Sequence, residues 1–280
     1  MSRVTVLYVA SSGHQYNLKT KGLMRLRNAN FHVWSWDVDG TRLQYGVRVA
    51  NFTRDALAYE AELVFDGAIP DRKKLIEDLH EDFELDVRTM QTGRIIWGDY
   101  YIDCFIRFSS TYPDQNNWYT DNNITIYCPH PFWIKEESRH FFGRSGSVTS
   151  EFLDYEYDYD YDYYIGDPGV ASWDTKFPFA SDFRMTVFGP VSNPRILVNG
   201  YPYAFSDTLD ASEYAIIDSR DNTLTKVTSA GRHVSIFDAR NKAHSIFEKI
   251  PGGQLILNWS GLFGFDLTLY EERSEPRWNI

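Results

Sequence analysis

The sequence predicts a mainly β protein of two domains, on three observations. Aromatic residues make up 16% of the 280 residues, and Tyr and Phe, with 19 copies each, favour half-buried pleated surfaces. Short alternating segments recur after residue 183 without helical periodicity. A junction over residues 123–137 separates a part that mixes strands with one helix from a part that is almost entirely β. We therefore predict one domain over residues 1–134 and a second over residues 135–280.

The junction, NITIYCPHPFWIKEE, begins as a half-buried strand. Its apolar residues alternate with polar ones and are Ile124, Ile126 and Cys128. Pro129 and Pro131 lack a backbone donor and end the strand. His130, between the two prolines, is interpreted as structural. An apolar segment, residues 132–134, then opens the second half of the chain.

The first domain is predicted to hold several strands. They cover residues 3–10, 30–37, 47–52 and 58–65, and Asp39-Gly40 is expected to form a turn. A hairpin is expected over residues 94–109 around Gly98-Asp99, and its second arm, YYIDCFIRFSS, alternates cleanly. Residues 18–27 are basic and fit no single element.

Residues 70–90 form the one convincing helix, with its main part over residues 70–87. Pro70 suits a first helical position, and Asp71 places a negative charge near the positive end of the helix dipole. Leu75, Leu79 and Phe83 recur every fourth residue and make one apolar stripe with Ile76 beside it. The polar residues, expected on the other faces, are Lys73, Lys74, Glu77, Asp78, Glu81 and Asp82. The stripe predicts a helix packed on a sheet.

The second domain reads as a β-sandwich. Predicted strands cover residues 183–188, 195–198, 201–205, 213–218, 223–227, 235–237, 254–259 and 265–270. Asn199-Gly200 is a strong hairpin turn signal between two of them. Many short strands at even spacing are typical of a sandwich.

Composition limits the partners. A net charge of −11 disfavours nucleic acid and anionic membranes, which require clustered Lys and Arg. No segment approaches the ~20 apolar residues of a membrane span, and the first residues do not resemble a signal peptide. Cys104 and Cys128 lie in apolar strand-like runs, so buried free thiols are expected.

No catalytic, cofactor-binding or metal-binding residues are predicted, and no cofactor. The seven histidines show no zinc spacing, and no nucleophile elbow, Walker loop or dinucleotide fingerprint is present. The run DYEYDYDYD, residues 154–162, places carboxylates about 7 Å apart on one face of an extended chain, which does not surround an ion. Five tryptophans are candidates either for a sugar site or for the core: Trp97, Trp118, Trp133, Trp173 and Trp259.

Several segments, in this order, resemble the distal tail protein family of long-tailed, non-contractile bacteriophages (siphophages). CPHPFW matches the junction between that family's two domains. FGPVSNPRILVNG resembles its Gly-Pro and Asn-Pro strand start, and EYAIIDSRDNTLTKV its following strand–turn–strand. FEKIPGGQLILNWSGLFGFDLTLYEERSEPRW resembles its closing hairpin and terminal Arg…Trp. The resemblance covers nearly the whole chain, with its most specific motifs in the second half.

The resemblance implies a virion structural protein and no enzyme. The first domain would be a β-sandwich or split barrel with one helix and a long hairpin, forming a ring, with a hexamer expected. The second domain would be a galectin-like β-sandwich. The ring would join the tail tube protein to the baseplate, with a tail-associated hub or lysin protein and a receptor-binding protein as further partners. Such a protein is made in the host cytoplasm and located at the distal end of the virion tail.

Two other functions stay open on the residues alone. The aromatic sandwich suggests a carbohydrate-binding module that contacts the host cell surface. Abundant carboxylates suggest a glycoside hydrolase, which needs two carboxylates at a defined separation across a cleft.

Overall fold

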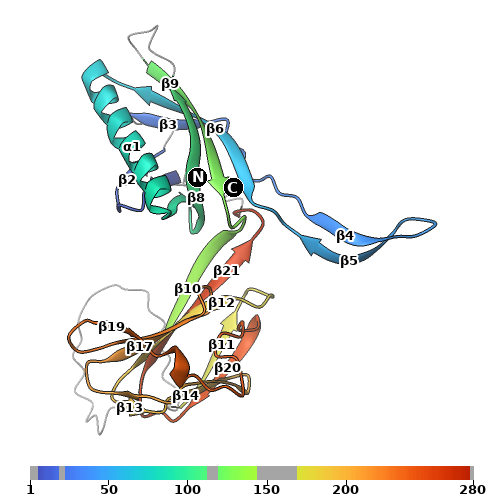
Figure 1. The fold of residues 1–280 in the computed structure, drawn as a ribbon, viewed down its shortest axis with the longest axis vertical. Coiled ribbons are helices and arrows are strands. Elements are labelled where there is room, and N and C mark those ends of the chain that lie inside the picture. The colour runs from blue at the N-terminus through green and yellow to red at the C-terminus, as the bar shows by residue number, and fades with distance from the viewer. Residues whose placement is uncertain (1–5, 19–22, 112–118, 144–168, 278–280) are drawn as a thin grey trace. The chain divides into compact units, whose positions relative to one another are not determined.

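The computed structural model describes residues 6–18, 23–111, 119–143 and 169–277. Backbone contacts divide the chain into two compact units, Met1–Lys135 with Glu272–Ile280, and Glu136–Glu271. Strands β10 (Trp133–Phe141) and β21 (Phe265–Arg273) pass from one unit to the other (Figure 1). The predicted fold class is confirmed: the described residues are mainly β, with β-sandwich architecture and a single α-helix.

Within the described part of the first unit, nine strands and the helix come before β10. They are β1 Val6–Val9, β2 Gln15–Asn17, β3 Met24–Arg27, β4 Asp37–Arg42, β5 Val47–Thr53, β6 Leu57–Asp66, α1 Ile69–Thr89, β7 Gly93–Trp97, β8 Tyr100–Thr111 and β9 Tyr119–Cys128. One sheet has the order β10-β8-β7-β1-β2, and a second has β8-β9-β6-β3. β4 and β5 form a separate two-stranded sheet.

Strand β8 belongs to both main sheets of the first unit. Its first half pairs with β7, and its second half pairs with β9 after a register shift between Ile106 and Phe108. At the opposite side, the amide of Leu26 in β3 donates to the carbonyl of Leu18, just after β2, at 3.5 Å. The two sheets therefore share one strand and nearly meet at their other edges, which is the arrangement of a split barrel.

The helix follows its sequence pattern. α1 has Pro70 in its first turn, Asp71 near its N-terminus, and a left-handed residue, Met90, at its C-terminal cap. Leu79 and Phe83 are buried, and α1 packs against β8 and β6. The predicted stripe is therefore the face that covers the barrel.

The prediction from the sequence is wrong about Asp82 on α1 and does not include the burial of Asp86. Asp82, assigned to a polar face, is buried, and Asp86 is 0% exposed. Tyr16 donates its hydroxyl to Asp82 at 2.5 Å, and Tyr8 donates to Asp86 at 2.5 Å. The amide of Ser11 also donates to Asp86, at 2.9 Å. The carboxylates tolerate burial because these donors, which come from β1, β2 and the turn between them, replace water.

Two predictions in the first domain are corrected. Residues 30–36 of the strand predicted over 30–37 are not a strand, because Phe31 turns into the core and packs edge-on against Tyr59 and Trp133; Asp37 begins β4. Asp39-Gly40 is not a turn but lies inside β4, at a register shift against β5. The local Asp-Gly signal is overridden by continued pairing of the two strands beyond it.

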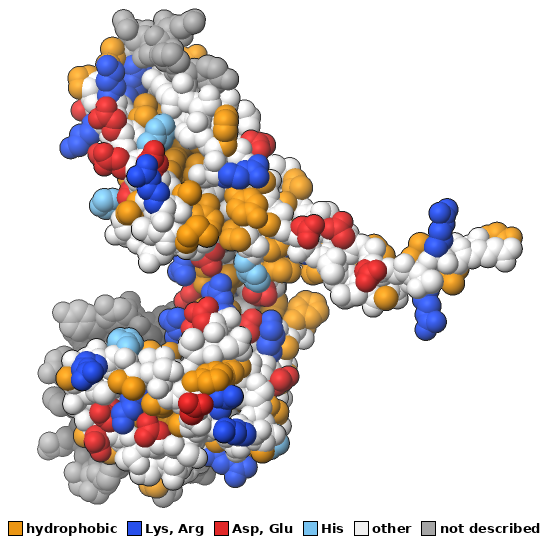
Figure 2. Space-filling view, viewed as in Figure 1, with side chains coloured by type: hydrophobic (Ala, Val, Ile, Leu, Met, Phe, Trp, Pro, Cys, Tyr) orange, Lys and Arg blue, Asp and Glu red, His pale blue; other side chains and the backbone are white. Residues whose placement is uncertain are grey.

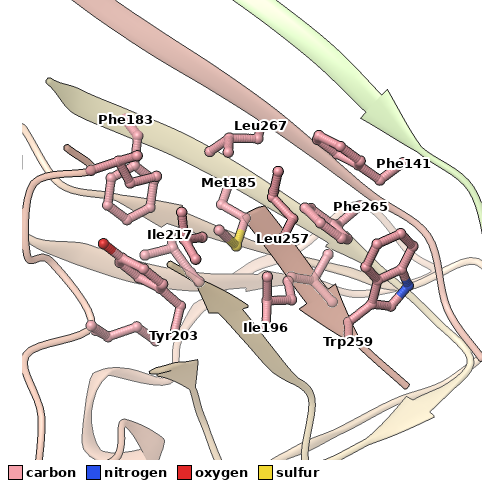
Figure 3. Close-up of a cluster of buried hydrophobic side chains, with 14 of the residues drawn as sticks. Phe141, Phe183, Met185, Ile196, Tyr203, Ile217, Leu257, Trp259, Phe265 and Leu267 are labelled. Carbon is pink, nitrogen blue, oxygen red and sulfur yellow. The ribbon is translucent and has the colours of Figure 1, made fainter. Parts of the chain in front are cut away.

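The second unit is the predicted sandwich. Its further elements are β11 Val170–Thr175, β12 Asp182–Phe188, β13 Val191–Ser192, β14 Arg195–Val198, β15 Tyr201–Ala204, β16 Thr208–Leu209, β17 Tyr214–Asp218, β18 Thr223–Val227, β19 His233–Ser235, the 3-10 helix η1 Phe237–Ala239, and β20 Gly253–Trp259. One sheet runs β19-β18-β17-β12-β21-β10, and the other β11-β20-β14-β15. Figure 3 shows the alternating inward side chains of both sheets, such as Met185 and Leu257, packed into one core.

The end of the chain packs with the first unit, whereas the sequence placed it in the second domain. The ring of His130 lies 2.6 Å from the carboxylate of Glu272. Arg54 donates to the carbonyl of Ser274 at 3.4 Å. These contacts join residues more than a hundred positions apart, which the sequence pattern does not indicate.

Candidate functional site

The candidate functional site is an arm, defined here as β4, β5 and the turn between them. The two strands pair with each other, and the described strands include no other partner for either one. Every residue from Asp37 to Thr53 is exposed. Figure 1 shows the arm extending away from the rest of the first unit. Both outer strand edges therefore present unpaired backbone donors and acceptors.

A β-bulge gives the arm two different faces. In an antiparallel pair, residues directly opposite each other lie on the same face, and faces alternate along a strand. β4 alternates without interruption, whereas β5 holds one extra residue, Ala50, because Asp39 faces Asn51 and Gly40 faces Val49. Four apolar residues consequently share one face, and we call them the apolar stripe: Val38, Val47, Val49 and Phe52. The opposite face carries Asp37, Asp39, Thr41, Arg48, Asn51 and Thr53.

The bulge depends on Gly40. A Cβ built on Gly40 would lie 2.5 Å from the carbonyl oxygen of Arg48 and 2.8 Å from the Val47 side chain. Any other residue would push β4 and β5 apart at this point. The absence of a side chain at Gly40 thus allows the register that places Phe52 in the same stripe as Val47 and Val49.

The tip of the arm is apolar and basic. Leu43 donates its amide to the carbonyl of Gly46 at 3.0 Å, and Gly46 adopts a φ of 84°, so this four-residue turn replaces the one expected at Asp39-Gly40. Tyr45 is 87% exposed. Basic side chains lie toward the tip and acidic ones toward the base, as Figure 2 shows, and the two basic residues are Arg42 and Arg48.

The hairpin expected over residues 94–109 is largely paired within its own chain. The hairpin over residues 94–109 exists as β7 and β8, with Trp97 opposite Tyr100. However, β7 also pairs with β1, and β8 also pairs with β9 and β10. This hairpin therefore lies inside the sheets, with β7 paired on both sides, whereas both outer edges of the arm lack a described partner.

The tryptophans proposed for a sugar site are mostly in the core. Trp133, Trp173 and Trp259 are buried, and Trp97 packs partly buried against the first core. Trp118 lies outside the described residues. Among the tryptophans that the structure describes, the exposed ones are Trp34 and Trp36, near the base of the arm. Neither was among the five candidates for a sugar site.

The cysteines behave as predicted. Cys104 and Cys128 are free and buried. Burial raises the pKa of Cys128 to about 12 and also raises the pKa of Cys104 well above its ordinary value. Neither thiol is a nucleophile at neutral pH, because the thiolate is the reactive form.

One cluster places a serine beside a histidine. His80 and Ser109 line a groove of about 390 Å³ between α1 and β8. The Asn122 amide nitrogen lies 2.9 Å from Nε2 of His80, and the Ser109 hydroxyl donates to the Asn122 oxygen at 3.1 Å. Burial lowers the pKa of His80, although Glu84 opposes the shift, so Nε2 accepts from Asn122. The Ser109 oxygen also lies 3.1 Å from Nε2 of His80. Because the one lone pair of Nε2 accepts from the Asn122 amide, the serine proton is assigned to the Asn122 oxygen.

The described ranges hold no cluster of three or more His, Cys, Asp or Glu residues able to bind an ion. The run of residues 154–162 lies outside the described residues, so its expected failure to bind metal stays a prediction. No helix in the described part of the chain is long and apolar enough to span a membrane.

The fold has known relatives among solved structures. The chain is similar to the Dit protein (gp 19.1) of phage SPP1, described as a paradigm of the hub adsorption apparatus in phages that infect Gram-positive bacteria. The TM-score is 0.62 at 11% identity, over 97% of this chain and 100% of that one. This chain shares the fold of a phage hub protein.

Two further similar chains come from the phage P2 baseplate in its activated conformation. The form with Ca gives a TM-score of 0.67 at 13% identity, over 99% of this chain and 100% of that one. The form with Sr gives 0.66 at 12%, over 98% and 100%. No family model matches the sequence, and no curated protein matches it. Because these identities are low, the comparisons establish the fold and leave the function to be argued from the site.

Proposed function

We propose that this protein is a structural component of a phage virion, a distal tail protein that joins the tail tube to the baseplate. The observation that carries the proposal is the arm, an exposed amphipathic hairpin on a chain with a hub fold. An isolated two-stranded hairpin is at best marginally stable in water. The arm gains a stable environment when its apolar stripe and open edges contact another chain.

A second copy of the same chain is the proposed partner of the arm. An arm that contacts a different surface of an identical chain makes a head-to-tail interface, and such interfaces close into a ring when the rotation fits. We expect a hexamer of first units, as in the siphophage distal tail proteins that the sequence resembles. In this proposal the second unit is a galectin-like sandwich outside the ring-forming domain.

The remaining parts of the proposal concern partners and location. The tail tube protein would bind one side of the ring. A tail-associated hub or lysin protein and a receptor-binding protein would bind elsewhere. The protein would be made in the host cytoplasm and would reside at the distal end of the virion tail. Its role would be assembly rather than catalysis.

The carbohydrate-binding alternative was suggested by the aromatic sandwich. Three of the five tryptophans that could line a sugar site are buried. The glycosidase alternative depended only on abundant acids, and two of these, Asp82 and Asp86, are bound to tyrosines in the first unit. Neither alternative therefore has a specific observation in its favour.

The test is the mass and symmetry of the full chain. Light scattering and negative-stain class averages of the purified protein, with and without the tail tube protein, are expected to give a closed six-fold ring in at least one condition. A protein that stays monomeric in both conditions would contradict the proposal. Glycan-array binding by that monomer would favour the carbohydrate-binding alternative.

A further inference from the structure

The arm is attached to the first unit through a small cluster at its base. Trp36 directly precedes β4, and Arg54 directly follows β5. Because all residues between them are exposed, the contacts at these two ends determine the direction in which the arm points. We call this group the base cluster, and its members are Trp36, Arg54, Phe132, His130, Glu272 and Ser274.

Arg54 lies at the centre of the base cluster. Its guanidinium carbon is 4.8 Å from the ring centroid of Phe132 and 5.8 Å from that of Trp36. The two rings are 5.9 Å apart. Arg54 also donates to the carbonyl oxygen of Ser274 at 3.4 Å. One side chain thus connects both ends of the arm to two other segments of the chain.

Contacts with the neighbouring residue His130 hold Phe132 in place. The amide of Phe132 donates to the carbonyl of His130 at 2.9 Å, and the two rings are 5.1 Å apart. His130 in turn lies 2.6 Å from the Glu272 carboxylate. Phe132 belongs to the connection between β9 and β10, and Glu272 to the end of β21. His130, which the sequence analysis interprets as structural, thus contacts both Phe132 and Glu272.

The chemistry of the base cluster is specific to a guanidinium. Among the described residues no carboxylate lies within ion-pair distance of Arg54, and its Nη1 atom is buried without a hydrogen-bond partner. The attraction therefore comes mainly from the faces of the two aromatic rings. A planar guanidinium stacks flat on a ring with its donors held in a rigid fork at its edge, whereas an ammonium has no planar face to stack.

We propose that Arg54 is a positioning residue that fixes the direction of the arm before another copy binds it. The expected effect on assembly rests on the proposed ring function, whereas the effect of Arg54 on the direction of the arm does not. A loosened arm would populate the productive direction only part of the time. If that fraction falls to about a tenth, the protein concentration needed for half-assembly rises about tenfold.

The geometry is tested on the full chain without any ring. Spin labels at Gln44→Cys, in the arm turn, and Lys74→Cys, on α1, report the arm direction as a distance distribution. Both positions are exposed, and the two native cysteines are buried and resist labelling. We expect a narrow distribution in the parent and a broad one in Arg54→Lys and Arg54→Ala. Arg48→Ala, which removes an exposed arginine from the polar face of the arm, is the matched control and should stay narrow.

Several outcomes separate this inference from the proposed function. Unchanged narrow distributions in both Arg54 variants would overturn the positioning role. Broadening with unchanged melting temperature supports it, and if Arg54→Ala does not fold, Arg54→Lys decides the question. Broadening in Arg54 variants of a protein that never forms rings would refute the ring and keep the positioning role. Where rings form, the half-assembly concentration of Arg54→Lys should rise about tenfold, and that of Arg48→Ala should not.

Discussion

Polar replacement of the apolar stripe should prevent assembly while the monomer stays folded. The double variant Val49→Thr and Phe52→Ser changes two stripe residues that are 47% and 54% exposed. Because about half of each residue is already in contact with its own chain, a partner can bury only the remaining half. Full burial of a Val or Phe side chain is worth about 1.5–3 kcal/mol, so the exposed half contributes roughly 1 kcal/mol at each position.

The two losses together weaken one contact by roughly 2 kcal/mol, which corresponds to about a 30-fold change in its dissociation constant. The monomer should be little affected, since both side chains lie on the arm and outside the two cores. Mass photometry over a dilution series, in the presence and absence of the tail tube protein, measures the concentration at which rings fall apart. Circular dichroism melting of the same samples confirms the fold.

A matched variant on the other face of the same strands provides the control. Thr41→Ser and Asn51→Ser alter the polar face of the arm and leave the apolar stripe intact. We expect this control to assemble like the parent protein. If the stripe variant assembles at the parental concentration, or if both variants lose assembly equally, the reasoning from the amphipathic arm is wrong.

Three further outcomes test the fold of the first unit. Leu79 is 1% exposed, so Leu79→Ala should lower the free energy of unfolding by about 2–5 kcal/mol in denaturant titration. Leu79→Asp should unfold the unit because it buries an unpaired charge. An unchanged melting profile would contradict the packing of α1. Burial alone would raise the pKa of Asp82, but hydrogen bonds from Tyr16, Ser12 and His14 outweigh burial and lower that pKa. The ionised Asp82 therefore stabilises the fold above the ordinary Asp pKa of about 4, and this stabilisation is lost as the pH falls below that value. Asp82→Asn should therefore be less stable than the parent at neutral pH and lose less stability on acidification, and parallel pH profiles would speak against this. A thiol reagent at neutral pH should modify neither Cys104 nor Cys128 in the native protein and both in denaturant, whereas rapid native labelling would show that these residues are accessible.

The local sequence pattern was sufficient to predict those helices and strands that bury one regular face. The helix and its apolar stripe follow from Leu79 and Phe83 because one face of a helix packs on a sheet, and the period of 3.6 residues records that face. The strand that ends before Pro129 and the short strands of the second unit are legible for the same reason, with a period of two. The absence of zinc and nucleotide motifs was also visible in the sequence.

Only the tertiary structure decided which polar residues are buried and which apolar residues are exposed. Asp82 and Asp86 resemble solvated helix residues in sequence, and they are buried because tyrosines 66 and 78 positions away donate to them. Phe52 alternates out of step with Val47 and Val49, and it joins their face only because the strand pairing skips Ala50. Burial and register depend on partners distant along the chain, so neither is recorded in the local sequence.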